Sequence, residues 1–189
     1  WLLPDSLMTS LGSLQVVQEV RLRADPGRTR DASPVAAARW LVSWFNGTSK
    51  TPGAPKFRYS LVHRPASGDD CVYRFLTKEP FGHCEYFATA TVLLLRQLAI
   101  PARYAVGYSV HEPSGSGYVV RLSDAHAWCL VWNEARQTWV DFDTTPASWV
   151  AEEAKNRSPF RWLSDVWSRL TFEFSKFKWG QSKLRQYLL

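Results

Sequence analysis

Three residues of this chain carry side chains that could together perform nucleophilic chemistry: Cys84, His126 and Asp143. A cysteine thiolate attacks carbonyl carbon, a histidine exchanges protons near neutral pH, and a carboxylate can orient the imidazole ring. Any one of these residues alone would be weak evidence. A nucleophile, a base and an orienting acid in this order predict acyl transfer by a thiol.

The cysteine is predicted to begin a helix. Pro80 and Gly82 interrupt the chain just before a run whose apolar residues recur every three to four positions. This pattern predicts an amphipathic helix from about Cys84 to near Ile100, where Pro101 prevents its continuation. A thiol in the first turn faces unpaired amides and the positive end of the helix dipole, which favour the thiolate. The alternative is that this cysteine is a small buried apolar residue, as free cysteines commonly are.

The histidine and the aspartate are predicted to lie on neighbouring strands. The segments HAWCLVW and TWVDFD are rich in aromatic and β-branched residues and flank the loop Asn133–Arg136, which predicts a β-hairpin. If Trp132 pairs with Gln137, His126 lies directly opposite Asp143, with Cβ atoms about 5 Å apart. The carboxylate can then hold one imidazole nitrogen and leave the other for the thiol. A slip of one residue would place the two side chains on opposite faces.

The other segments predict an α+β fold, in which the cysteine-bearing helix packs on an antiparallel sheet and N-terminal helices lie alongside. Strands are expected at ARYAVGYSV and YVVRL, with the loop HEPSGSG between them, and FRYSL is expected to be extended. A helix is expected after the N-cap residue Ser33, with Pro34 in its first turn. A further helix is expected from about Asp5, although Gly12 weakens it.

Three segments resemble the sequence blocks of the transglutaminase-like superfamily: GHCEYFATATVLLLRQLAIPARYAVGY, SDAHAWCLVW and WVDFDTTP. The resemblance covers roughly Asp69 to Pro146. It is closest to the bacterial branch, in which such a domain lies outside the cytoplasm on a membrane protein with several spans. It implies a papain-like arrangement of helix and sheet.

The resemblance also implies roles for the three residues. Cys84 would be the nucleophile, His126 the general base and acid, and Asp143 the residue that orients the histidine, with no metal or organic cofactor required. The chain departs from the family at one point, because the family commonly has Asp-Pro-Thr where this chain has Asp143, Thr144 and Thr145. The aspartate remains, so the departure concerns only the exit from the strand.

Three functions are compatible with these residues. The first is cysteine-dependent acyl transfer on protein or peptide carboxamides through a thioester. The second is a cysteine peptidase or amidase that acts on peptide or cell-wall peptide. The third is a non-catalytic binding module, which would have no need of all three residues. The sequence does not name a second donor for the oxyanion, and Tyr59 is either an accessory residue of the cleft or a half-buried strand tyrosine.

Composition predicts a folded chain with one catalytic domain. Its 189 residues include ten tryptophans, and 46% of them are hydrophobic. We expect N-terminal helices in residues 1–50, the catalytic core in 51–150 and an aromatic, basic helical segment in 151–189. The net charge of +6 suits nucleic acid, an anionic membrane surface or anionic cell-wall polymers. No nucleic-acid motif is present, so we expect the basic charge to reflect a membrane setting. The expected partner is a protein or peptide substrate, with no nucleic acid.

A membrane setting is expected outside the cytoplasm. No apolar run approaches the roughly 18 residues that span a bilayer, and Trp1 begins no signal peptide. With the resemblance, this predicts a periplasmic domain cut from a larger membrane protein, associated with the membrane through flanking segments. Aromatic and basic residues favour the bilayer interface, so residues 151–189 are either a juxtamembrane element or a helix laid across the core.

The three cysteines, Cys71, Cys84 and Cys129, form no CxxC pair. Outside the cytoplasm one disulfide could form, and Cys71 with Cys129 is the pair to consider. Core packing is the simpler interpretation of Cys129, which lies on the opposite strand face from His126. A zinc site built from Cys84, His83 and His126 is less favoured, because structural zinc sites need four close ligands.

Overall fold

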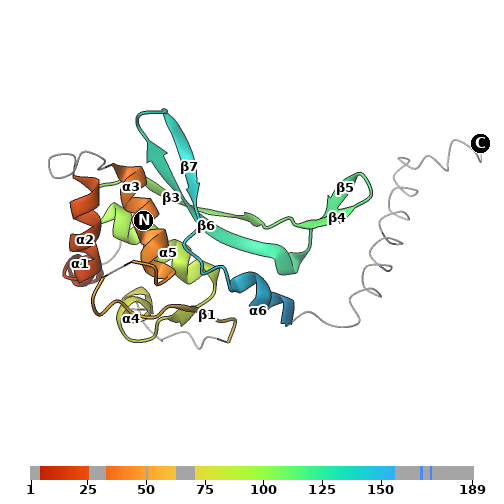
Figure 1. Cartoon of the computed structure of the whole chain (residues 1–189), viewed down its shortest axis with the longest axis horizontal. Helices are drawn as coiled ribbons and strands as arrows, with labels where there is room; N and C mark the ends of the chain where they lie inside the picture. The colour runs from red at the N-terminus through yellow and green to blue at the C-terminus, as the bar shows by residue number, and fades with distance from the viewer. Residues whose placement is uncertain are drawn as a thin grey trace, which may run out of the picture. The chain divides into compact units, whose positions relative to one another are not determined.

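The computed structural model describes residues 5–25, 33–49, 51–62, 71–155, 167 and 171. The chain divides into two compact units, Trp1–Glu152 and Glu153–Leu189. The first unit begins with five helices (Figure 1), which are α1 (Asp5–Gly12), α2 (Gln15–Ala24), α3 (Pro34–Phe45), α4 (Cys71–Thr77) and α5 (Cys84–Arg96). A sixth, α6 (Trp149–Lys155), follows the sheet and crosses the boundary between the units.

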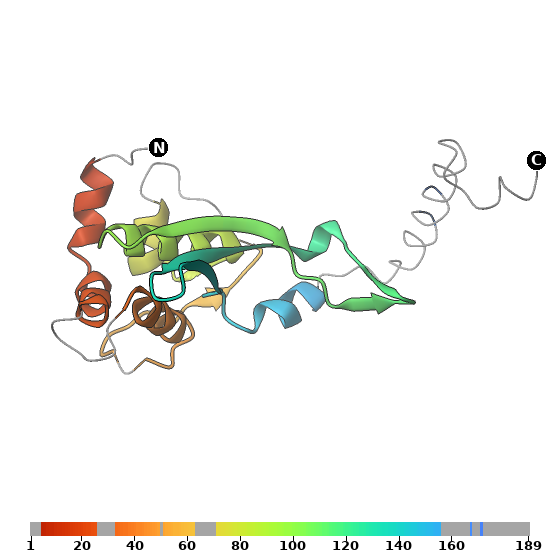
Figure 2. The same ribbon diagram turned by 90° about the horizontal axis from the view of Figure 1, so that it is seen from above.

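The main sheet is antiparallel and has three strands in the order β3-β6-β7. Its strands are β3 (Ala102–Tyr108), β6 (Ala125–Asn133) and β7 (Thr138–Phe142). Helix α5 packs against β6 and β3, and α3 also contacts β6. In Figures 1 and 2 the helices α1 to α5 gather at one end of the long strands, which project beyond them toward a small hairpin. The mixed fold therefore has the cysteine-bearing helix on an antiparallel sheet, as expected.

The start of α3 confirms the predicted cap. The Ser33 hydroxyl accepts a hydrogen bond from the amide of Ala36 at 3.1 Å, and Pro34 occupies the first turn, where no amide partner is needed. The N-terminal segment forms two helices instead of one. The break follows Gly12, a residue that disfavours helix and is the last residue of α1.

Four phenylalanines from four segments pack together and hold α5 against the rest of the core. Phe45 lies on α3, Phe57 precedes β1 (Arg58–Tyr59), Phe75 lies on α4 and Phe87 lies on α5. All six pairs of ring centroids are 4.7–6.2 Å apart, in mutually tilted, stacked and edge-on arrangements that aromatic rings favour. Because Phe87 is one turn from Cys84, this cluster fixes the start of α5 relative to the rest of the core.

Several predicted boundaries around the main sheet were wrong. Helix α5 ends at Arg96 instead of Ile100, because Ala99 adopts a left-handed conformation with φ of 58° before Pro101. The loop HEPSGSG contains β4 (Glu112–Ser114), which pairs with β5 (Gly117–Val119) around Gly115.

A strand was expected at YVVRL (Tyr118–Leu122), but β5 ends at Val119. The residues that follow it form a 3₁₀ turn at Leu122–Asp124, where the Asp124 carboxylate accepts a hydrogen bond from the amide of Arg121 at 3.2 Å. This local side-chain bond competes with strand pairing.

No helix in the described residues is both long and apolar enough to cross a bilayer. Most of the aromatic, basic segment 151–189 lies outside the described residues, so its expected role stays a prediction.

Candidate active site

The extended segment before α5 places Cys84 at the first position of this helix. Strand β2 (Phe81–Gly82) pairs in parallel with β1, and His83 continues the extended chain before the helix begins. Gly82 is required here, since a Cβ would lie 2.9 Å from the Tyr86 ring. The Cys84 side chain is buried, with 8% of its surface exposed. The thiol therefore lies at a helix N-terminus in a largely dry setting, where its charge depends on its neighbours.

The β6–β7 hairpin forms, but its predicted register was wrong by two residues. Trp132 pairs with Trp139, and Asn133 pairs with Thr138, so Gln137 belongs to the turn. The turn holds this register because Gln137 adopts a φ of 50° and the Asn133 side chain accepts a hydrogen bond from the Arg136 amide at 3.2 Å. A shift of two residues preserves the face of each side chain, whereas a shift of one would reverse it.

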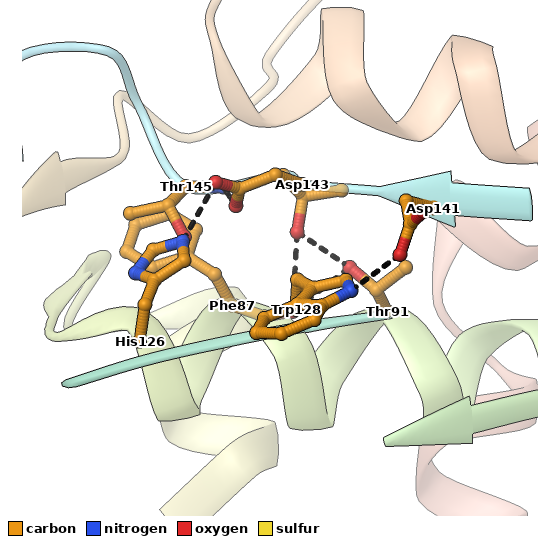
Figure 3. Close-up of polar contacts among 8 residues, drawn as sticks. Phe87, Thr91, His126, Trp128, Asp141, Asp143 and Thr145 are labelled. Carbon is orange, nitrogen blue, oxygen red and sulfur yellow. Dashed lines mark hydrogen bonds and ion pairs between the residues drawn. The ribbon is translucent and has the colours of Figure 1, made fainter. Parts of the chain in front are cut away.

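His126 and Asp143 therefore still meet, diagonally instead of directly opposite. The distance from His126 Nε2 to Asp143 Oδ2 is 2.7 Å (Figure 3), and the other carboxylate oxygen accepts a bond from the Thr145 amide at 2.9 Å. Burial acts to raise the pKa of Asp143, but the hydrogen bonds from His126 and Thr145 outweigh it and hold that pKa below its ordinary value. The carboxylate is thus ionised and fixes the imidazole through Nε2.

The second imidazole nitrogen is left for the thiol. His126 Nδ1 is buried and has no hydrogen-bond partner among the described residues. Burial acts to raise the pKa of Cys84, but interactions with the side chains of His126 and His83 and with the amide of Ala127 lower it to about 7. Burial acts to lower the pKa of His126, yet the hydrogen bond to Asp143 and the influence of the Cys84 side chain raise it to about 9. Between these two values the thiolate and the imidazolium coexist.

Two tryptophans flank the imidazole. The Trp149 ring, at the start of α6, stacks on His126 with centroids 4.4 Å apart and planes at 13°. Trp128 lies 6.3 Å from the same ring at 15°, and its Nε1 donates a 2.7 Å hydrogen bond to Asp141 (Figure 3). Gly107 pairs with His126 across the sheet, and a Cβ there would lie 2.8 Å from the Trp128 ring. The histidine is therefore held by a carboxylate at its edge and by aromatic rings on its faces.

A model of the transglutaminase-like superfamily matches residues 24–144, a range that includes Cys84, His126 and Asp143. The chain belongs to the transglutaminase-like superfamily. Over 127 residues, or 66% of its length, it is 36% identical to a protein-glutamine gamma-glutamyltransferase of Pseudomonas aeruginosa, of which it covers 18%. It is 34% identical over 117 residues to the uncharacterised protein YebA of Bacillus subtilis, covering 55% of this chain and 16% of YebA. The chain thus spans under a fifth of the length of these relatives.

The crystal structure of the periplasmic domain of TgpA from Pseudomonas aeruginosa has a similar fold. The two share 32% sequence identity and a TM-score of 0.52, over 80% of this chain and 50% of that one. The α+β transglutaminase-like fold expected from the sequence is confirmed.

The departure from the family pattern at Thr144 has a structural role. Thr144 is buried, and its hydroxyl lies 2.8 Å from the Thr91 hydroxyl and donates to the Phe87 carbonyl at 3.3 Å (Figure 3). The Thr91 hydroxyl also bonds to that carbonyl, at 2.8 Å. Thr91 and Phe87 lie on α5, the helix that begins with Cys84. The residue after Asp143 therefore ties the acid to the helix of the thiol.

Sequence reasoning missed Trp149 and underestimated the burial of Tyr59. Tyr59 is 6% exposed and lies in an apolar cluster with Cys84, Ala88, Ala127 and Trp149. Its accessory role stays a prediction. The only local signal for Trp149 is an aromatic residue at the start of a helix shortly after Asp143, which is too common a feature to single out.

All three cysteines are free, so the structure contains no Cys71–Cys129 bridge. Cys129 is fully buried, and burial raises its pKa to about 12. No group of three or more metal-binding side chains occurs among the described residues.

Replacing Trp149 with alanine is expected to lower kcat about tenfold, because an aromatic stack contributes roughly 0.5–1.5 kcal/mol and holds the imidazole in place. Trp149→Phe keeps a stacking ring and is expected to retain most of the activity. The measurement is kcat and KM for amide turnover, with the midpoint of thiol alkylation against pH as a second readout. Equal losses in the alanine and phenylalanine variants would contradict a role through stacking.

Proposed function

We propose that the chain is a cysteine-dependent acyltransferase of protein or peptide carboxamides, in which Cys84 is the nucleophile, His126 the general acid and base, and Asp143 the orienting residue. The observation that carries the proposal is the buried His126 imidazole, bonded through Nε2 to Asp143 and with Nδ1 left for a thiol whose pKa is about 7. Burying an imidazole that pairs with a carboxylate costs desolvation free energy, so its placement beside a thiol at a helix start suits catalysis.

The first half of the proposed reaction forms a thioester. The Cys84 thiolate attacks the carboxamide carbon, and the backbone amide of Cys84 at the helix start is a suitable donor to the developing oxyanion. The C–N bond then breaks as the His126 imidazolium gives its proton to the leaving nitrogen, which departs as ammonia from a primary carboxamide. His126 is left neutral, with Asp143 still holding its Nε2–H.

The second half releases the acyl group. An amine or a water molecule attacks the thioester carbon, and neutral His126 takes the proton that the attacking group loses. The C–S bond breaks, and its electron pair stays on sulfur as the thiolate. An amine gives a new amide, and water gives the free acid.

The pH dependence of kcat/KM is expected to be bell-shaped. Activity rises as the pH passes about 7, where Cys84 becomes a thiolate, and falls as the pH passes about 9, where His126 loses the proton that the leaving nitrogen needs. Initial rates of ammonia release between pH 5 and pH 10 measure both limbs. A rate that keeps rising beyond pH 9 would contradict acid catalysis by His126.

A cysteine peptidase or amidase, including one that acts on cell-wall peptide, is the second candidate, because the same three residues also support hydrolysis. Acyl transfer is favoured because the Pseudomonas aeruginosa relative is named a protein-glutamine gamma-glutamyltransferase. A non-catalytic binding module is the third candidate, and the thiol pKa of about 7 is a property that binding alone does not require.

Incubation with a glutamine-containing peptide and a labelled primary amine separates these functions. Incorporation of the amine supports acyl transfer, whereas ammonia release or chain cleavage without incorporation supports hydrolysis. The absence of all three products over a panel of peptides, together with an unreactive Cys84, would support a binding module.

We also propose that the domain lies outside the cytoplasm and is held at a membrane by flanking segments of a longer protein. The support is its similarity to a structure described as a periplasmic domain. In cells that produce the full-length protein, a reporter fused after this domain tests its location. A reporter that is active only in the cytoplasm would refute it.

A further inference from the structure

The strand β3 presents an open edge in the main sheet. It is the outer strand of the order β3-β6-β7, and no strand among the described residues pairs with its other side. Figure 2 shows it running past the helices toward the β4–β5 hairpin. Proteins usually shorten, charge or cover such edges, because an unpaired strand is a template for another extended chain. The edge of β3 is seven residues long, so it is a candidate binding site.

The one charged residue of β3 does not protect this edge. The guanidinium carbon of Arg103 lies 4.0 Å from the centroid of the Trp139 ring. Trp139 lies on β7, on the far side of β6 from the open edge. The Arg103 side chain is therefore directed away from the edge, which keeps no charge of its own.

The main-chain groups that point to the open edge belong to the even-numbered residues of β3. The Trp132 amide donates to the Pro101 carbonyl at 3.1 Å, and the Ser109 amide donates to the Asp124 carbonyl at 2.8 Å. Both bonds fit one antiparallel register, in which the odd-numbered residues exchange bonds with β6. The even-numbered residues therefore direct their N–H and C=O groups outward, and the exposed ones are Tyr104, Val106 and Tyr108.

The side chains of these three residues are apolar and uncovered, with 42%, 69% and 48% of their surface exposed. Tyr104 pairs with Cys129, and Val106 pairs with Ala127, so each pair shares one face of the sheet. Cys129 and Ala127 are buried on the face that α5 covers. Helix α5 therefore covers this face over β6 and leaves it open over the outer part of β3.

This open face begins beside the reactive sulfur. Ala127 lies in one apolar cluster with Cys84, and its amide helps to lower the pKa of the thiol. Val106 is directly opposite Ala127, one strand spacing or about 4.8 Å away. Tyr104 is close enough to respond to the sulfur, because burial raises its pKa and the charges of Glu85 and Cys84 raise it further. The edge and the thiol therefore belong to one continuous surface.

We propose that the acyl donor binds as an extended segment added to the open edge of β3, with its glutamine opposite Val106 and its carboxamide directed toward Cys84. The inference rests on the proposed acyl transfer and assigns the site of its donor. Opposed residues share a face, so this glutamine points to the α5 side of the sheet, where Cys84 lies. The added strand lies about 10 Å from β6, and the long glutamine side chain reaches back across Val106.

The same placement gives the edge a preference for neighbouring residues. Side chains two positions before and two positions after the glutamine lie on its face of the added strand. They would contact Tyr104 and Tyr108, which flank Val106 on that face. Main-chain bonds then supply affinity for any extended donor, and apolar residues at these two positions supply specificity.

A polypeptide donor suits this edge better than a second copy of the chain does. Two copies that each carry a net charge of +6 repel one another. Two copies joined through β3 would also each cover the approach to the other's Cys84. An extended peptide brings no such charge and delivers the carboxamide that the thiol attacks.

N-methylated peptides test the main-chain bonds with the wild-type chain. A peptide with one central glutamine is compared in two further forms, methylated on the amide of the first or of the second residue after the glutamine. Only alternate amides of an added strand face β3, so only one of the two methyl groups removes a bond. The values of kcat/KM for ammonia release are expected to differ about three- to tenfold, the size of one hydrogen bond. Equal values would refute strand addition.

Replacing Val106 with proline removes an outward N–H and leaves the bonds between β3 and β6 in place, because proline is tolerated at such edge positions. With the unmethylated peptide, kcat/KM is expected to fall about three- to tenfold. The difference between the two methylated forms should disappear.

Val106→Thr is the matched variant, since threonine keeps both the amide and a β-branched side chain. It should keep the difference between the methylated forms. Loss of that difference in both variants would assign it to the side chain and contradict the main-chain role. Thermal unfolding shows whether the proline variant is folded, and if it is not, the methylated peptides with the wild-type chain decide.

Three outcomes separate this inference from the proposed function. Ammonia release that is equally fast with both methylated peptides would overturn the donor edge and leave the thioester chemistry intact. A chain that forms no thioester with any peptide, as measured by intact-protein mass spectrometry, would overturn both. A dimer detected by light scattering and dissociated by Val106→Pro would assign the edge to a second copy and overturn the donor site.

Discussion

A chain with Cys84 replaced by alanine is expected to lose all acyl transfer and nearly all reaction with iodoacetamide at pH 7. A pKa of about 7 makes about half of the wild-type Cys84 a thiolate at that pH, whereas an ordinary thiol is only a few per cent ionised. The thiolate is the form that attacks both the alkylating agent and a carboxamide. Intact-protein mass spectrometry over a time course measures the labelling, and amine incorporation measures the transfer.

Cys129→Ala is the control for this change. Cys129 is fully buried with a pKa of about 12, so this variant should label as fast as the wild type. Strong labelling that persists in Cys84→Ala would identify Cys71 as the reactive thiol. That result would contradict the proposed nucleophile.

Replacing His126 with glutamine is expected to lower kcat/KM by roughly 10²–10⁴-fold, the usual contribution of a positioned acid and base. Glutamine cannot carry the proton to the leaving nitrogen, and it removes the imidazolium that stabilises the thiolate. The pKa of Cys84 is therefore expected to rise above about 7, which moves the alkylation midpoint to higher pH. Alkylation rates between pH 5 and pH 10 report this shift even when turnover is too slow to measure.

His111→Gln is the matched control for the histidine. His111 is exposed between β3 and β4, where its Nδ1 lies 2.8 Å from the Ser109 carbonyl. Its replacement should leave both the turnover and the alkylation midpoint unchanged. An unchanged alkylation midpoint in His126→Gln would show that the imidazole does not control the thiol, and the proposed mechanism would then fail.

Local patterns in the sequence were sufficient for the elements that carry the three candidate residues. Apolar spacing predicted the helix at Cys84, and aromatic and β-branched residues predicted the strands of His126 and Asp143. These features depend on short-range preferences that each segment expresses by itself. The prediction therefore placed Cys84 and His126 on the elements where the structure has them, whereas Asp143, expected within the second strand of the hairpin, follows the last residue of β7.

The register of the hairpin could not be predicted in the same way. It depends on Gln137 adopting a positive φ and on one bond from the Asn133 side chain, and other turns of similar length fit the same sequence. The prediction retained the correct face for Asp143 only because the error was an even number of residues.

Contacts between distant segments were also beyond sequence reasoning. Trp149 stacks on His126, and Thr144 bonds to Thr91, but neither pair leaves a periodic or motif-like trace in the chain. Such features depend on tertiary packing, which a single sequence records only indirectly.

The hydroxyl pair of Thr91 and Thr144 joins positions 53 residues apart and closes a loop that contains the whole main sheet. Local unfolding of the chain after β7 must break the contact between these two hydroxyls. It would also move Asp143 away from the imidazole while the phenylalanine cluster stays folded. On heating, catalytic turnover should therefore be lost at a lower temperature than the one at which the domain as a whole unfolds.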